Sequence, residues 1–170
     1  MTQTVTTILS VLTVVAQVVS LVLLIALLLN RRRPPVGLLR LAGQHGVLLS
    51  FIVSLIATLG SLYYSEVANF TPCLLCWYQR ILMYPQVILL TVAYFTQDKG
   101  VVKYVLPLCV LGAGIALYHY ALQLGAPIAA PCEVVGYSAS CAERFVLQFG
   151  YITIPLMAFS AFVLNALWLI

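Results

Sequence analysis

The sequence contains very little charge. Only four of its 170 residues are Asp or Glu and eight are Lys or Arg, so 7% are charged while 64% are hydrophobic. Soluble domains are about 25% charged and less than half apolar. A soluble globular domain and a disordered chain are therefore excluded, and we predict an all-α integral membrane protein. About 20 residues per span leave no room for a sizeable extramembrane domain, so an ATPase or a kinase is also excluded.

Five apolar runs are long enough to cross about 30 Å of hydrocarbon at about 1.5 Å per residue. They cover residues 5–29, 45–64, 77–95, 104–124 and 147–170. The first run is followed by basic residues rather than preceded by them, and it lacks a small-residue cleavage site, so we expect a retained helix and not a signal peptide. The chain is thus divided into an extra N-terminal transmembrane helix with a basic linker (1–44) and a four-helix membrane domain (45–170).

The basic residues predict an orientation in the membrane. The first and third connections carry six of them, namely Arg31, Arg32, Arg33, Arg40, Lys99 and Lys103, whereas Arg80 and Arg144 accompany the second and fourth. Basic connections stay in the cytoplasm. We therefore expect the N-terminus outside and the C-terminus inside a prokaryotic cytoplasmic (inner) membrane, with residues 65–76 and 125–146 on the oxidising face. The net charge of +4 then reflects orientation rather than nucleic-acid binding.

Four of the five cysteines fall in the two connections expected outside. Cys73 and Cys76 form a C-x-x-C before the third run, and Cys132 and Cys141 lie in the last outer connection. Four such cysteines predict disulfides with three possible connectivities. A C-x-x-C ring adds little stability and is typical of redox pairs, so exchange chemistry is favoured over structural bridges. Cys109, alone within an apolar run, is expected to behave as a small hydrophobe.

A zinc site is the competing interpretation of the four cysteines, because four thiolates can form a tetrahedral set. The second pair has eight residues between its members, rather than the two to four of a zinc motif, and neither outer connection contains His. We therefore expect no metal.

Two ionisable side chains fall within apolar runs. Cys76 lies near the start of the third helix, where free N–H groups and the helix dipole lower a thiol pKa. Arg80 follows one turn later on the same face, about 6 Å deeper, where its charge would stabilise a thiolate or bind a ligand carbonyl. His119 is about 8 Å below the outer end of the fourth run. We expect Arg80 and His119 to line one pocket. The alternatives are that Arg80 snorkels to the membrane surface and that His119 is a core histidine bonded to a backbone carbonyl.

Two disulfides on one face predict a relay of thiol–disulfide exchange. The sequence contains no haem-attachment C-x-x-C-H, no Gly-rich dinucleotide fingerprint and no cluster of metal ligands. A lipid-soluble quinone beside Cys76 is therefore the simplest electron acceptor that remains.

At these residues the chain resembles the DsbB family, including its shorter BdbC-type members. The stretches that carry the resemblance are 73–80 (CLLCWYQR), 119–123 (HYALQ), 131–132 (PC), 141–144 (CAER) and 149–155 (FGYITIP). The resemblance implies a four-helix membrane bundle that reoxidises a DsbA-like thioredoxin-fold partner and passes the electrons to ubiquinone or menaquinone. VKOR-type quinone reductases are a less good match, because their loop pair precedes the C-x-x-C.

The resemblance also implies a role for each site residue. Cys132 would form the mixed disulfide with the partner, and Cys141 would then exchange with Cys73. Cys76 would be the thiolate that faces the quinone, with Arg80 and His119 at the quinone site. The chain departs from the family in its extra N-terminal run and in its short loop between Cys132 and Cys141. A non-enzymatic membrane protein braced by two disulfides is the alternative from a different class.

Overall fold

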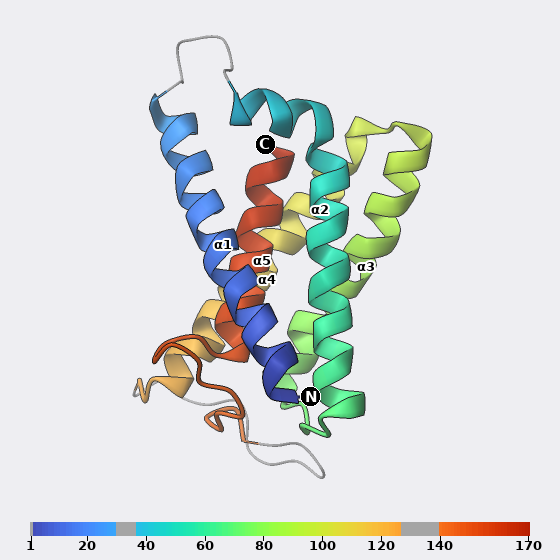
Figure 1. Ribbon diagram of the computed structural model, residues 1–170. Helices are drawn as coiled ribbons and strands as arrows, with labels where there is room; N and C mark the ends of the chain where they lie inside the picture. Colours follow the sequence, from blue (N-terminus) through green and yellow to red (C-terminus); the bar gives the residue numbers. More distant parts are fainter. Residues whose placement is uncertain (1, 30–36, 127–139) are drawn as a thin grey trace.

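The computed structural model describes residues 2–29, 37–126 and 140–170, and within these ranges the regular structure is helical (Figure 1). The α-helices are α1 (Thr2–Leu29), α2 (Leu38–Leu62), α3 (Leu74–Thr96), α4 (Val102–Gln123) and α5 (Ile154–Leu169). A π-helical turn (Tyr63–Val67) continues α2, and a 3₁₀ turn (Lys99–Val101) precedes α4. The expected all-α class is confirmed for these parts of the chain.

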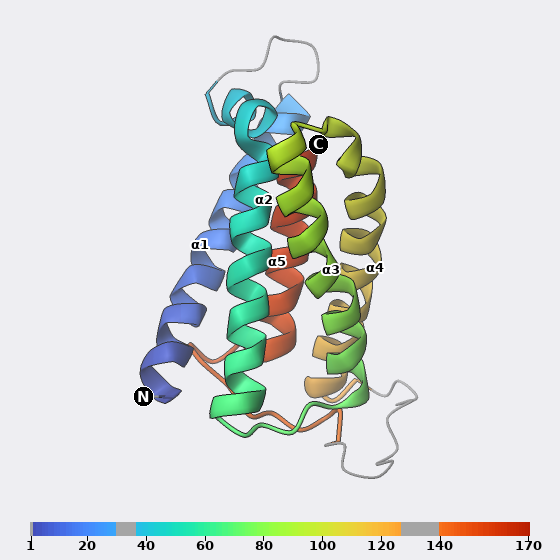
Figure 2. The same ribbon diagram turned by 90° about the vertical axis from the view of Figure 1, so that its right-hand side faces the viewer.

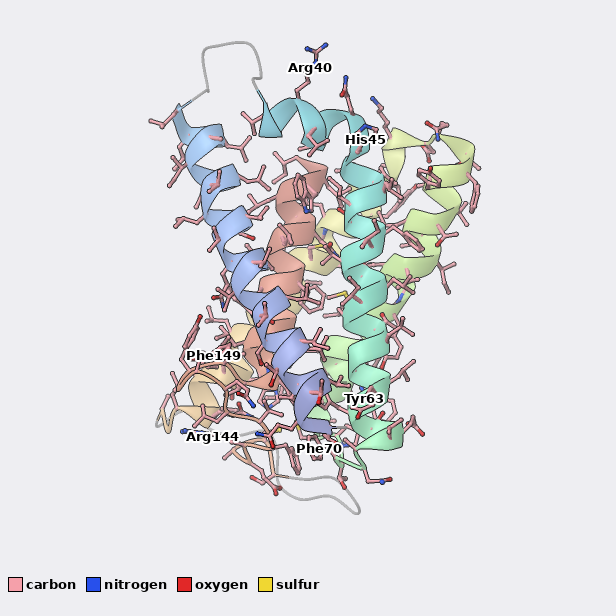
Figure 3. The ribbon with its side chains drawn as sticks, viewed as in Figure 1. Arg40, His45, Tyr63, Phe70, Arg144 and Phe149 are labelled. Carbon is pink, nitrogen blue, oxygen red and sulfur yellow. The ribbon has the colours of Figure 1, made fainter. Side chains whose placement is uncertain are left out.

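Helix α5 lies in the middle of the bundle, where it packs against α1, α2 and α4 (Figure 1). Helix α3 packs between α2 and α4 on the far side from α1 (Figure 2). The N-terminus of α1 lies at the same end as the start of α3, which we call the cysteine end. Figure 3 shows Phe70 and Arg144 at this end, and Arg40 and His45 at the opposite end with the C-terminus. The described parts of the connections lie at the ends that were expected, whereas residues 30–36 and 127–139, with Arg31, Arg32, Arg33 and Cys132, lie outside the described residues. The sidedness of the connections in a membrane stays a prediction.

Three helical segments are long and apolar enough to cross a membrane: Thr2–Leu29, Leu39–Val67 and Lys99–Gln123. A shorter apolar helix covers Ile154–Leu169. Helix α3 has 23 residues but carries polar side chains such as Gln79, Arg80 and Gln86. The membrane character of the chain is thus clear from three helices, whereas the count of four spans plus one stays a prediction.

The last helix begins later than the apolar run indicates. Residues 147–153 form a tight turn in which Gln148 and Ile152 exchange two backbone hydrogen bonds of 2.9 Å. Phe149 and Gly150 both have positive φ, of 52° and 78°, which a helix does not allow. Pro155 then occupies the first turn of α5, where its missing N–H costs nothing. The expected start at residue 147 is therefore wrong, because hydropathy does not distinguish an apolar turn from a helix.

A buried polar cluster joins four of the helices at mid-height. Asn165 of α5 donates to Ser54 of α2 at 2.7 Å and to Gln86 of α3 at 3.1 Å. The free thiol of Cys109 on α4 donates to the same Gln86 oxygen at 3.5 Å. Such groups need partners where no water is available. Interhelical hydrogen bonds of this kind contribute about 0.6 kcal/mol each on average, and they fix how the helices face one another.

Helix α1 docks through a stripe of small and polar side chains. These follow one another at alternating spacings of four and three residues, which places them on one helix face: Thr6, Ser10, Thr13, Gln17 and Ser20. Gln17 donates to Ser160 of α5 at 3.2 Å and accepts from the Tyr151 hydroxyl at 3.1 Å. Tyr64 donates to Thr6 at 3.3 Å. Since small residues let helices approach closely, α1 is a packed part of the bundle and not a loose tether.

Candidate active site

Cys73 is the N-cap of α3. Its backbone is extended (φ −79°, ψ 172°), and its Sγ accepts a hydrogen bond from the Cys76 backbone N–H at 3.4 Å. The sulfur therefore occupies the position in which Ser or Asp oxygens usually cap a helix. Cys76 lies in the first turn, with its Sγ 3.0 Å from that of Cys73, and both thiols are free. The sequence predicted the helix start correctly but assigned the pKa-lowering position to Cys76, whereas Cys73 holds the cap.

His119 contacts Cys73 from α4. Its Nε2 lies 3.6 Å from Cys73 Sγ and 3.1 Å from the carbonyl oxygen of Cys141. The Gln79 amide nitrogen lies 3.0 Å from Nδ1 and can only donate, so Nδ1 accepts and the ring proton sits on Nε2. Gln79 thus orients His119 so that its N–H points at Cys141 and Cys73.

These contacts favour the thiolate form of Cys73. The side-chain hydrogen bond from Cys76 does most to hold the pKa of Cys73 well below its usual range. Burial acts in the opposite direction, and the hydrogen bond from His119 lowers this pKa further. Because the thiolate is the reactive form in disulfide exchange, Cys73 is the primed sulfur of the pair.

Cys141 approaches Cys73 from the segment before α5. The ligand atoms of Cys73, His119 and Cys141 all lie within 4.8 Å of one another, and all three residues are buried. Cys141 is in a disulfide, whereas Cys73, Cys76 and Cys109 are free. Reacting atoms need to come to about 3–3.5 Å, so a small shift brings the Cys73 thiolate onto the Cys141 sulfur. Cys132 lies outside the described residues.

Cys73, His119 and Cys141 could form a set of metal ligands if Cys141 were reduced to the thiolate. Zinc takes cysteine only as the thiolate. Cys141 has no thiolate to offer while it is disulfide-bonded. As found, this cluster is arranged for exchange between sulfurs.

Arg80 lies on the other side of the C-x-x-C and is turned toward α2. Its Nε donates to Ser61 Oγ and its Nη2 to the Ser61 carbonyl oxygen, both at 3.0 Å. The Tyr84 hydroxyl also donates to Ser61 Oγ, and the guanidinium carbon lies 5.3 Å from the centre of the Trp77 ring. Arg80 is nine-tenths buried, so the alternative of a snorkelling side chain does not describe it.

Arg80 and Cys76 line an apolar cavity of about 380 Å³. This volume is typical of small-molecule sites. Its polar lining side chains gather near the cysteine end, around Ser61, Gln79 and Arg80, and its far end is formed by side chains such as Leu49 and Trp168. His119 does not line this cavity; it lines a smaller one with Cys73 and Cys76. Contact between His119 and a ligand therefore stays a prediction from the resemblance.

Sequence reasoning missed several residues that build the site. Gln79 orients His119, Ser61 holds Arg80, and Gln123 donates to the Glu143 carbonyl oxygen at 2.8 Å, two residues after Cys141. Gln79 and Gln123 had a signal in the sequence, because an amide inside an apolar run needs a partner. Ser61 had none, since a serine in a membrane helix commonly bonds its own backbone.

Comparison with known proteins identifies the family. The family model described as "Disulfide bond formation protein DsbB" matches residues 43–170. The chain belongs to the DsbB family. It is 48% identical over 115 residues to Disulfide bond formation protein C of Bacillus subtilis (strain 168), which covers 68% of this chain and 83% of that protein. No solved structure matches this chain.

Two further DsbB-type relatives show similar coverage. The Probable disulfide formation protein C of Bacillus cereus is 43% identical over 120 residues, or 71% of this chain and 86% of that protein. The Probable disulfide formation protein of Coxiella burnetii (strain CbuK_Q154) is 43% identical over 132 residues, which cover 77% of this chain and 89% of that protein. The family and the apolar helices together make this chain a membrane protein of disulfide bond formation.

Proposed function

We propose that this protein is a membrane protein-dithiol:quinone oxidoreductase that reoxidises a DsbA-like thioredoxin-fold partner. The observation that carries the proposal is the position of the C-x-x-C between two different sites. Cys73 contacts His119 beside Cys141, and Cys76 lines the apolar cavity with Arg80. One cysteine pair can therefore receive electrons on one side and give them up on the other.

The first half of the reaction takes place at Cys132 and Cys141. A thiolate of the reduced partner attacks Cys132 of the loop disulfide, which releases Cys141 as a thiolate. The second partner thiol then attacks the mixed disulfide, so the partner leaves oxidised and the loop pair is reduced.

The second half transfers the disulfide from the C-x-x-C back to the loop. Cys141 attacks Cys73 of a Cys73–Cys76 disulfide and releases Cys76 as a thiolate. Cys132 then attacks Cys141, which restores the loop disulfide and leaves Cys73 and Cys76 reduced. This end state has the same sulfur states at Cys73, Cys76 and Cys141 as the structure.

The residues around Cys76 fit a quinone. A bound quinone supplies an acceptor for two electrons and two protons. The apolar walls suit its hydrocarbon, and Arg80 lies one turn from Cys76, where its charge stabilises the Cys76 thiolate and negative charge on a carbonyl oxygen. Loss of two electrons and two protons from the two thiols closes the Cys73–Cys76 disulfide. The reaction faces the extracytoplasmic side of a prokaryotic inner membrane.

The test is catalytic quinone reduction by the purified protein in detergent. A reduced DsbA-like protein and a soluble quinone analogue are added, and quinone absorbance is followed. We expect turnover in the wild type, its loss in Cys76→Ser and Cys132→Ser, and a weaker reaction in Arg80→Ala. Cys109→Ser is the matched control, because Cys109 is a free buried cysteine on α4 that hydrogen-bonds Gln86 in the mid-height cluster.

The same experiment tests the alternative of a disulfide-braced structural protein. In that case no thioredoxin-fold partner causes quinone loss, and the disulfide at Cys141 persists under mild reductant. That combination would overturn the proposal.

A further inference from the structure

We propose, resting on the function above, that α1 forms the wall along which the hydrocarbon tail of the quinone lies. Helix α1 would then make the protein selective for tailed quinones over tail-less ones. The family match begins at residue 43, after α1 has ended, so this wall comes from a part of the chain that the family model does not cover.

The cavity is elongated along the bundle. On α2 its lining runs from Ser61, which holds Arg80, to Leu49. At about 1.5 Å per residue this stretch is about 18 Å of helix. A quinone ring beside Cys76 and Arg80 fills only the cysteine end of such a cavity, so the remainder is available to a tail.

The chemistry of the walls changes along this length. Ser61, Gln79 and Arg80 supply hydrogen-bonding groups at the cysteine end, whereas Leu49, Leu164 and Trp168 are at the other end. An amphiphile with a polar ring and a long apolar tail matches this gradient. A compact polar solute does not, because it would leave the apolar end without a partner.

Helix α1 supplies one long side of the cavity. Its lining residues are Leu9, Leu12, Thr13, Val15, Ala16 and Val19. Leu12 and Val15 are 41% and 52% exposed, so they lie where the cavity meets the surroundings of the bundle. A tail that enters between the helices would therefore contact α1.

Three hydrogen bonds and one close packing contact hold this wall in place. Gln17 hydrogen-bonds Ser160 and Tyr151, and Thr6 accepts from Tyr64. A side chain at position 60 would meet Leu9 within 3.1 Å, so α1 and α2 are in close contact there. A helix held in this way presents a constant surface, which selection between ligands requires.

The experiment narrows the cavity from α1, far from the reacting sulfurs. Ala16→Phe places a large side chain on the lining, and Ala16→Leu is a milder version. Val18→Phe is the control, because Val18 is 56% exposed and is absent from the lining. The probes are menaquinone with a short isoprenoid tail and menadione, its tail-less ring, with the matching ubiquinone pair run in parallel.

Binding is read without turnover, as quenching of tryptophan fluorescence in the absence of any thiol donor. Trp77 lies beside Arg80 at the cysteine end and Trp168 lines the far end, so quenching reports a quinone at either end of the cavity. We expect Ala16→Phe to raise the Kd of the tailed quinone about tenfold and that of the tail-less quinone less than about twofold. Ala16→Leu should give a smaller change in the same direction, and Val18→Phe none.

Two outcomes would overturn the role of α1 and leave the proposed function intact. In the first, the Kd values of tailed and tail-less quinones rise equally; in the second, neither Kd changes in either Ala16 variant. A wild-type protein that binds neither quinone would overturn both. Exchange between Cys141 and Cys73 serves as the folding control, and if Ala16→Phe loses it, Ala16→Leu decides by the same criterion.

Discussion

Cys73 and Cys76 are three residues apart, but their surroundings differ. Cys73 is buried, with His119 and Cys141 beside its sulfur. Cys76 is half-buried and opens onto an apolar cavity with Arg80. The comparison teaches that a single helical turn separates a site suited to exchange between sulfurs from a site suited to a lipid-soluble acceptor. The predictions below test the two sides and how far they act independently.

The largest expected effect comes from replacing either cysteine. Both Cys73→Ser and Cys76→Ser should reduce turnover by more than about 10³-fold, because each removes a reacting sulfur. The two differ in what they trap. In Cys76→Ser the Cys73 thiolate attacks Cys141, so a Cys73–Cys141 disulfide should accumulate and be found by peptide mass mapping. A Cys76–Cys141 disulfide in Cys73→Ser would reverse the assignment of the two sides.

Arg80→Gln should affect only the cavity side. Loss of a hydrogen bond from a charged group costs about 1.5–3 kcal/mol, so KM for the quinone should rise about 10–100-fold. The rate at which reduced Cys141 opens the Cys73–Cys76 disulfide, measured by quenched-flow alkylation, should stay the same. Arg144→Gln is the control at an exposed arginine of the cysteine end. A slower exchange in Arg80→Gln would show that the two sides are not independent.

His119→Ala should affect the sulfur side through the pKa of Cys73. In the reduced wild type that pKa lies well below its usual range, so alkylation of Cys73 by iodoacetamide should change little with pH between about pH 6 and 8. In the variant, Cys76 still lowers the pKa of Cys73, but the smaller lowering by His119 is lost. As the pH is decreased, alkylation of Cys73 should therefore begin to fall at a higher pH than in the wild type. Identical profiles would contradict the role given to His119.

The same pKa shift has a consequence for the stability of the reduced protein. Because the folded-state pKa of Cys73 is lower than the unfolded one, folding gains stability that is fully present above about pH 8.5. This gain is lost as the pH falls through the folded value. His119→Ala should weaken this dependence in thermal unfolding of the reduced protein.

The smallest expected effect is that of Gln123→Leu. It removes the hydrogen bond to Glu143 and loosens the segment that carries Cys141. One such bond is worth about 1 kcal/mol, so exchange between Cys141 and Cys73 should slow about fivefold while quinone affinity is unchanged. Gln44→Leu, at an exposed glutamine of the opposite end, is the control. An unchanged exchange rate would show that Glu143 is held by other contacts.

Sequence reasoning predicted the helices and the cysteines of the site, but not how the site is divided. Apolar runs locate helices because burial in lipid requires them, and the resemblance to the DsbB family implied that Cys73 and Cys141 meet. Depth along a helix was used to place Arg80 beside His119. Depth does not give the direction in which a side chain points, and here Arg80 turns to Ser61 of α2 while His119 faces Cys141.

The polar cluster around Asn165 affects the order in which the protein can be assembled. Helix α5 follows α1 to α4 along the chain and is therefore synthesised after them, and it brings the amide that donates to Ser54 and Gln86. Until then the earlier helices lack that donor in a medium without water. A nascent chain that stops before α5 lacks this donor, so the hydrogen bonds of the polar cluster are completed only after α5 has been made.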